Sequence, residues 1–126
     1  MCLVRNDSVK ITGDRVWKIL KIRWNSLKSI HHKFIWKKGW NLCPDICSNQ
    51  DIFVMYGFHV YLEKPSDDRA LSFDGVIAEF EFDLKDLIAT GYHDFSNLKQ
   101  AVFKRLKLDK KEYARIMESS HVLNPR

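Results

Sequence analysis

Alternating hydrophobic and polar residues predict that the chain folds mainly into β-strands. Between residues 76 and 82, apolar side chains occupy every second position, and Glu79 and Glu81 lie between them. Successive side chains of a strand point to opposite faces, so this segment is typical of a half-buried strand. Residues 16–24 are rich in β-branched and aromatic side chains, without Gly or Pro, and we interpret them as a second strand. A helix is the alternative there, because several apolar positions also fit helical spacing.

The segment 57–62 predicts the central strand of the sheet. Phe58, Val60 and Leu62 share one face, which we expect to be core. His59 and Tyr61 share the other face. The alternation therefore leaves His59 and Tyr61 as candidate ligand-binding residues.

The remaining strands and loops are predicted from shorter signals. We expect a strand at 34–36 that forms a hairpin around Gly39 with residues 40–42, and a final strand at 100–108. Residues 25–33 are predicted to be a polar connection and residues 84–90 a partly buried, strand-like loop that ends at Gly91. The turn-forming residues near the N-terminus predict an irregular arm at 1–14, and the tail at 119–126 is expected to fray.

Two helices are expected from their capping signals. Pro65 and Ser66 precede two aspartates, which suit the first turn of a short helix within residues 64–71. Asp109 and Glu112 are three residues apart, a variant of the capping box, so a C-terminal helix should begin at Lys110.

These elements predict an α+β fold in a single domain spanning residues 1–126. We expect a mainly antiparallel sheet of five or six strands, with a short middle helix and a C-terminal helix. A chain of 126 residues with 45% hydrophobic residues can bury a core of its own.

The composition indicates a basic protein of the cytoplasm. Three cysteines without a framework spacing argue against a disulfide-stapled secreted fold. No apolar run reaches the length of a membrane span, and residues 1–5 are too short for a signal sequence. The formal net charge of +5 favours a polyanionic partner: nucleic acid, nucleotide or an acidic protein surface.

Catalytic and metal-binding signatures are weak in this chain. Cys43 and Cys47, together with His31, His32 and His59, contain the ligand types of a zinc site but lack a second well-spaced pair, so we assign no metal and no cofactor. His59, Tyr61 and Glu63 could support acid–base chemistry or ligand binding, and the alternative is a histidine held in the hydrogen bonds of the sheet. No nucleophile elbow or phosphate-binding glycine loop is present.

Tryptophans interleaved with lysines form the other candidate site. Aromatic and cationic side chains in alternation are typical of surfaces that stack bases and hold phosphates. The alternative is that Trp24 and Trp36 are core residues and the lysines solvate the outer face. Besides His59 and Tyr61, the candidate ligand-binding residues are Trp17, Trp36, Trp40, Lys37 and Lys38.

Several short motifs occur in one order along the chain: Met1-Cys2-Leu3, Trp17-Lys18-Ile19-Leu20, Phe34-x-Trp36-x-x-Gly39, and Gly57-Phe58-His59-Val60-Tyr61 with Ala70 behind it. Together they resemble motifs of small uncharacterised proteins of phages and bacteria. That resemblance implies an accessory gene of a phage or mobile element.

The Gly57-Phe58 strand followed by a helix with Ala70 is also similar to ADP-ribosyltransferase-like domains. That similarity implies a nicotinamide pocket between strand and helix, with Glu79 and Glu81 as candidates for the catalytic glutamate by position. The chain departs from the family by lacking a Ser-Thr-Ser strand.

Size, charge, surplus tryptophan and the phage resemblance together favour a non-enzymatic binding protein. We expect an accessory factor that inhibits a host defence system by binding a host protein or sequestering a nucleotide. The alternatives are an ADP-ribosyltransferase-like enzyme and a nucleic-acid-binding module.

Overall fold

Strands dominate the computed structural model of the protein, which describes residues 3–31, 33–44, 52–94 and 96–123, with the side chains of residues 120–123 not described. The helices are α1 (Asp67–Ser72), a 3₁₀ turn (Leu84–Asp86) and α2 (Lys110–Leu123). The strands are β1 (Leu3–Arg5), β2 (Val16–Arg23), β3 (Ser26–Ser29), β4 (Ile35–Trp36), β5 (Gly39–Leu42), β6 (Phe53–Val54), β7 (Phe58–Tyr61), β8 (Val76–Phe80), β9 (Leu87–His93), β10 (Lys99–Phe103) and β11 (Arg105–Leu108).

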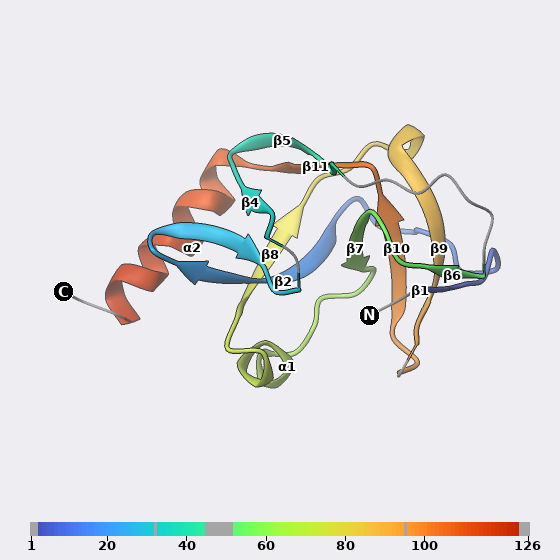
Figure 1. The fold of residues 1–126 in the computed structure, drawn as a ribbon, viewed down its shortest axis with the longest axis horizontal. Coiled ribbons are helices and arrows are strands. Elements are labelled where there is room, and N and C mark those ends of the chain that lie inside the picture. The colour runs from blue at the N-terminus through green and yellow to red at the C-terminus, as the bar shows by residue number, and fades with distance from the viewer. Residues whose placement is uncertain (1–2, 32, 45–51, 95, 124–126) are drawn as a thin grey trace.

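All strand pairs among the described residues are antiparallel, and most belong to one sheet of nine strands (Figure 1). The order is β4-β3-β2-β7-β10-β9-β1-β6, and β8 pairs with β2 in addition. Strands β11 and β5 form a separate pair. The α+β class, the antiparallel sheet, the short middle helix and the C-terminal helix are confirmed, whereas five or six strands was too low a number.

The strand pairings close into a ring around the main core. Strand β2 pairs with β7 and β8, and β7 pairs with β10. The chain continues from β10 into β11, where backbone hydrogen bonds of 3.0 and 2.9 Å join Lys107 to Glu81 at the end of β8. The enclosed core contains an aromatic cluster whose ring centroids lie 4.4 to 5.0 Å apart: Phe34, Trp36, Phe58 and Phe80.

The predicted strand faces and helix caps are largely confirmed. Phe58 and Val60 are buried in the main core, and alternate residues of β8 face inward. Ser66 caps α1, because its hydroxyl accepts a hydrogen bond from the Arg69 amide at 3.2 Å. Asp109 accepts from the Lys111 amide at 3.0 Å at the start of α2. That helix runs through Leu123, beyond the point at residue 119 where fraying was expected.

Three predicted segments, a loop, a hairpin and a strand, differ from their prediction in the structure. The polar connection at 25–33 contains β3, which pairs with β2 across a two-residue turn. Strands β4 and β5 do not form a hairpin around Gly39, because β4 pairs with β3 and β5 pairs with β11. The final strand is two strands divided at Lys104, whose carbonyl accepts a hydrogen bond from the Cys43 amide at 2.9 Å. The pairing of β5 with β11 and the bond between Cys43 and Lys104 join segments far apart in the chain, whereas β2 and β3 form a local hairpin.

The N-terminal arm and the loop at 84–90 also proved to contain strands. β1 lies between β6 and β9, and Leu3 is fully buried. β9 passes through Gly91, where a Cβ atom would lie 1.9 Å from the Val4 carbonyl oxygen. Gly91 therefore permits the close approach of two backbones and does not end the segment.

Replacing Gly91 by alanine should lower the free energy of unfolding by about 2 kcal/mol or more, because the new methyl group must displace the backbone of β1. Urea denaturation measures the change. Gly13→Ala is the matched control, since nothing lies within 4 Å of the corresponding Cβ position. Equal stabilities of the two variants would contradict this account of β1.

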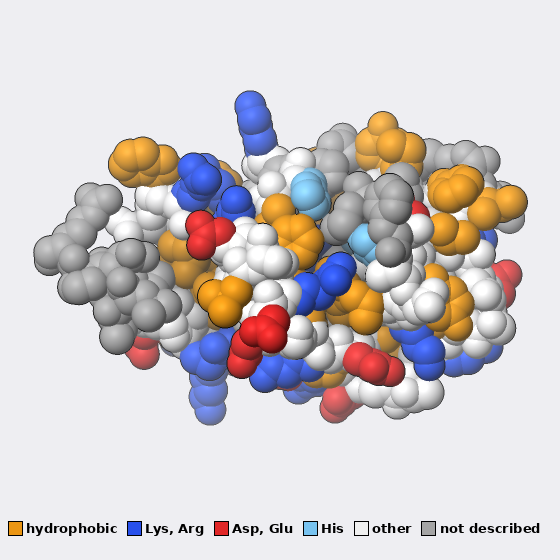
Figure 2. Space-filling view, turned by 90° about the horizontal axis from the view of Figure 1, so that it is seen from below, with side chains coloured by type: hydrophobic (Ala, Val, Ile, Leu, Met, Phe, Trp, Pro, Cys, Tyr) orange, Lys and Arg blue, Asp and Glu red, His pale blue; other side chains and the backbone are white. Residues whose placement is uncertain are grey.

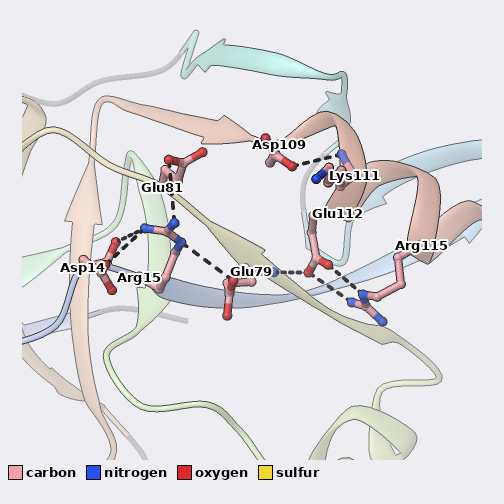
Figure 3. A network of polar contacts seen from close by, with 8 residues as sticks. All are labelled: Asp14, Arg15, Glu79, Glu81, Asp109, Lys111, Glu112 and Arg115. Carbon is pink, nitrogen blue, oxygen red and sulfur yellow. Dashed lines mark hydrogen bonds and ion pairs between the residues drawn. The ribbon is translucent and has the colours of Figure 1, made fainter.

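Two side chains of α2 cover an open edge of β8 (Figure 3). Glu112 accepts a hydrogen bond from the Glu79 amide at 2.7 Å, and Arg115 donates to the Ile77 carbonyl at 3.1 Å. Arg115 also donates to Glu112 at 2.6 Å. Unpaired backbone groups of an edge strand invite pairing with other chains, and here a carboxylate and a guanidinium occupy them. Burial raises the pKa of Glu112, but hydrogen bonds from Arg115 and the Glu79 amide outweigh it and lower the pKa below 4.5.

Glu112→Gln should reduce the free energy of unfolding at pH 7 by about 2 kcal/mol, the usual scale of a charged hydrogen bond. A carboxylate whose folded pKa is lowered stabilises the fold above its unfolded pKa, and this contribution disappears as the pH falls through the folded pKa. The difference between wild type and variant should therefore shrink below pH 4.5. Urea denaturation at pH 7 and below pH 4.5 measures the difference, and Glu118→Gln, at an exposed position of α2, is the control. A difference in the free energy of unfolding that did not change with pH would refute this role of Glu112.

Candidate ligand-binding cleft

A gap in the hydrogen-bond ladder of β2 creates the candidate site. Strand β8 occupies one edge of β2, and both β3 and β7 share the other. β3 pairs with residues 20–23, whereas β7 pairs with β2 only at Trp17. Among the described residues, Lys18 and Ile19 therefore have no partner strand on this edge, and the sheet opens into a seam at their positions.

The side chain of Lys18 enters this seam. Lys18 lies in register with Val16 and Leu20, which are fully buried on the core face. Its ammonium group donates a hydrogen bond to the His59 carbonyl of β7 at 2.8 Å. A charged side chain on an apolar face is unusual, so its partners decide what it does.

Burial lowers the pKa of Lys18 from 10.5 to about 8, although the charge interaction with Cys43 opposes this shift. The amine is consequently still mostly protonated at pH 7. Among the described residues, no carboxylate lies within ion-pair distance of it. An ammonium group has three donors, so the seam contains a buried cation with capacity for an anionic ligand.

Two cavities adjoin at this amine, and both are lined by Lys18, Ser29 and Gly57. The inner cavity has a volume of about 70 Å³, which is room for about two water molecules. The second cavity, which we call the Lys18 cleft, has a volume of about 300 Å³, at the lower end of the range for small-molecule sites. Its further lining includes Lys33, Phe34, Cys43, Met55, Tyr56 and Phe58.

His59 lines the inner cavity, but both of its ring nitrogens face backbone carbonyls. Nε2 lies 2.8 Å from the Val54 oxygen and Nδ1 lies 3.2 Å from the Gly57 oxygen. Burial, aided by the charge of Lys18, lowers the pKa of His59 despite these carbonyls. A neutral imidazole has one N–H, and the shorter distance favours its donation from Nε2 to Val54. His59 therefore joins β6 to β7, which fits the alternative of a histidine held by the sheet.

Tyr61 and Trp17 lie beneath α1 and away from the Lys18 cleft. Tyr61 is only 7% exposed and packs with Ile19 and Ala70. Its hydroxyl accepts a hydrogen bond from Arg69 at 3.1 Å, and Trp17 packs against the same cluster. The face expected to bind a ligand is thus largely covered by a helix, with the inner cavity as its remaining opening.

The other predicted ligand-binding residues are dispersed. Trp36 is 1% exposed in the aromatic core, and its indole N–H donates to the Ser29 hydroxyl at 2.9 Å, so its ring offers no face to a ligand. Trp40 lies under Arg105, whose guanidinium is 3.9 Å from the ring centroid. Lys38 lies over the Tyr113 ring at 5.7 Å, and Lys37 is exposed. None of the four lines the Lys18 cleft.

The residues of the two remaining site hypotheses are also separated. Glu79 and Glu81 lie near Arg15 on the far side of β8, at 3.7 and 3.8 Å, and neither lines a cavity with His59 (Figure 3). His32 and Cys47, considered for zinc, lie outside the described residues. Within the described part of the chain, no three His, Cys, Asp or Glu residues are grouped to hold a metal ion. No helix in that part is long and apolar enough to cross a membrane.

Sequence reasoning did not select the central residue of the cleft. One signal was present: Lys18 interrupts the inward register of Val16 and Leu20. Whether such a lysine is buried depends on the seam, which forms only where β7, distant in sequence, meets β2 beside β3.

Lys18→Met should raise the free energy of unfolding at pH 7, because it replaces a buried cation with an apolar side chain of similar length. The folded pKa of Lys18 is lowered, so the unfolded chain binds more protons between pH 8 and 10.5 and wild-type stability rises across that interval. The advantage of the variant should therefore shrink by roughly 3 kcal/mol as the pH rises through it. Urea denaturation at pH 7 and pH 10.5 measures both effects, and a constant difference would contradict the burial of the amine.

Comparison of the chain with protein-family models, curated protein sequences and solved structures finds no match. The function of the candidate site is therefore inferred from the geometry of the cleft.

Proposed function

We propose that the protein is a non-enzymatic binding protein that sequesters a small phosphate-bearing ligand, a nucleotide, in the Lys18 cleft. The observation that carries this proposal is the protonated amine of Lys18 in the cavity wall, with no carboxylate of the described residues within ion-pair distance. Phosphate oxygens would accept the remaining hydrogen bonds of the amine and neutralise its charge.

The other walls of the cleft suit the base and a second phosphate contact. Phe34 and Tyr56 contribute aromatic surface, and Phe58, which also lines the cleft, packs against the Phe34 ring. Aromatic side chains stack on any base, because every base has a π face. Lys33 is exposed at the same cavity and supplies a second cation. A volume of about 300 Å³ favours a single nucleotide over a longer ligand.

This proposal agrees with the setting that the phage resemblance implies. A phage or mobile-element accessory factor that removes a nucleotide from the host cytoplasm would blunt a defence system depending on that nucleotide. Binding is sufficient for this role, and no chemical step at His59 or at a glutamate is required.

A host protein is the second candidate partner, favoured by exposed apolar side chains around β6. Figure 2 shows hydrophobic side chains gathered at the end of the molecule where β1 and β6 lie. Exposed patches of this kind often mark protein contacts. The exposed members near β6 are Ile52, Phe53, Met55 and Tyr56, which are 48 to 65% exposed.

Isothermal titration with a panel of mono-, di- and cyclic nucleotides tests the main proposal. We expect binding by the wild type, a loss of at least tenfold in Lys18→Met, since a charged hydrogen bond is removed, and a smaller loss in Lys33→Met. Lys99→Met, an exposed lysine of β10 outside the cleft, is the matched control and should bind normally.

Mass spectrometry of small molecules released by denaturing the purified protein identifies the natural ligand. Equal nucleotide affinity in wild type and Lys18→Met would refute the cleft as the site. If no nucleotide binds or is released, while a host protein is captured by wild type but not by Phe53→Ser, the second candidate replaces the first.

A further inference from the structure

The turn between β2 and β3 has a backbone that its first residue disfavours. The turn consists of Trp24 and Asn25, with φ angles of 54° and 61°. Such two-residue hairpin turns require positive φ at both positions, which Asn and Gly adopt readily. A bulky residue there is uncommon, because its Cβ crowds the backbone. Trp24 therefore occupies this position at a cost in stability.

Packing does not compensate for this cost. Trp24 is 83% exposed, and among the described residues its ring makes no aromatic or cation–π contact. The largest apolar side chain of the hairpin thus stands in solvent in a disfavoured conformation. Neither property helps the protein to fold.

The charges beside the turn repel one another. Lys21 and Lys28 are directly opposite across the two strands, and like charges in that position destabilise a hairpin. Arg23 lies two residues beyond Lys21 and shares its face. Within the described part of the chain, none of these three cations makes an ion pair. Asp74 is the acidic residue that lines a hollow of about 350 Å³ together with Lys21, Ile22, Arg23 and Trp24.

The opposite face of the hairpin is apolar and packs on the core, as expected for a half-buried hairpin. Leu20 and Leu27 are buried in the main core, and Ile22 packs against it. The unfavourable choices are therefore confined to the outer face and the turn, which we call the hairpin tip: Lys21, Arg23, Trp24 and Lys28. Figure 2 shows basic side chains beside a hydrophobic one at the end of the molecule where this hairpin lies. Local violations of folding rules that serve no packing purpose are expected at functional sites.

We propose that the hairpin tip binds single-stranded nucleic acid, with a base stacked on Trp24 and phosphates held by Lys21, Arg23 and Lys28. An anionic backbone would relieve the repulsion between the two lysines, and a base would cover the exposed indole. Lys21 and Arg23 are about 7 Å apart along the strand, comparable to the repeat of phosphates on an extended nucleic-acid chain. Single strands present unstacked bases, whereas a duplex keeps its bases inside the stack.

This site is separate from the Lys18 cleft. The side chain of Lys18 enters the seam on the core face of β2, whereas Lys21 and Arg23 belong to the outer face. The two sites share no lining residue. Each proposal can therefore fail without the other.

Fluorescence anisotropy with a labelled mixed-sequence 15-nucleotide single strand tests the tip. We expect binding that weakens with salt with a slope of about −2 on a log–log plot, as three phosphate contacts predict. Trp24→Ala should lower the affinity by about tenfold or more, and Lys21→Gln, Arg23→Gln and Lys28→Gln should each weaken it and flatten the slope. Leu71→Ala and Lys99→Gln are matched exposed controls and should bind as the wild type does.

A second variant separates binding from folding. Replacing Trp24 by Asn and Asn25 by Gly installs the preferred turn, so the melting temperature should rise while oligonucleotide binding is lost. Absence of binding by the wild type at 50 mM salt would overturn the proposal. Equal affinity for duplex, or equal affinity for an acidic polypeptide such as polyglutamate, would also overturn it, because neither offers an accessible base to Trp24.

Discussion

Strand β2 has two edges and three partner strands, and the candidate cleft follows from how those edges are divided. Strand β8 covers one edge, while β3 and β7 share the other and leave a gap at Lys18 and Ile19. In the gap, a lysine side chain supplies the hydrogen bond to β7. This solution places a cation in a desolvated position, which lowers its pKa and leaves donors for an anion. The inner cavity and the Lys18 cleft, both lined by Lys18, follow from this edge of β2 that no strand fills along Lys18 and Ile19 in the described part of the chain.

A similar problem arises at β8, where the side chains of α2 solve it differently. Glu112 and Arg115 bind the exposed amide and carbonyl of β8, and each also neutralises the other. Beyond them, the bridge between Glu81 and Lys107 closes the ring of strands around the aromatic core. Glu112 and Arg115 neutralise each other at this edge, whereas no carboxylate of the described residues neutralises Lys18 in the seam. That contrast is why we propose a ligand at Lys18 and a structural role for Glu112 and Arg115.

The sequence predicted those elements whose signals lie within one segment. Alternation identified β2, β7 and β8, and capping residues identified α1 and α2, because neither signal depends on distant partners. Strands β1 and β6 have only three and two residues, and the division at Lys104 depends on Cys43, so local patterns contained little information about them. The faces of His59 and Tyr61 were predicted correctly, but only the folded chain reveals that α1 covers Tyr61. The burial of Lys18 away from the described carboxylates is likewise a property of three-dimensional packing.

Both proposed sites involve β2, and in both a residue departs from what its local environment favours. Lys18 is charged where its neighbours are buried and apolar, and Trp24 is apolar and exposed at a turn that favours Asn or Gly. Each departure costs stability, and a protein retains only a small margin of stability. The aromatic core around Trp36 and Phe80 and the closed ring of strands supply that margin, and neither Trp36 nor Phe80 lines either site. Because each of these two residues costs stability where it lies, Lys18→Met and the double change of Trp24→Asn with Asn25→Gly should remove binding and strengthen the fold, the opposite of what a purely structural role for either residue would require.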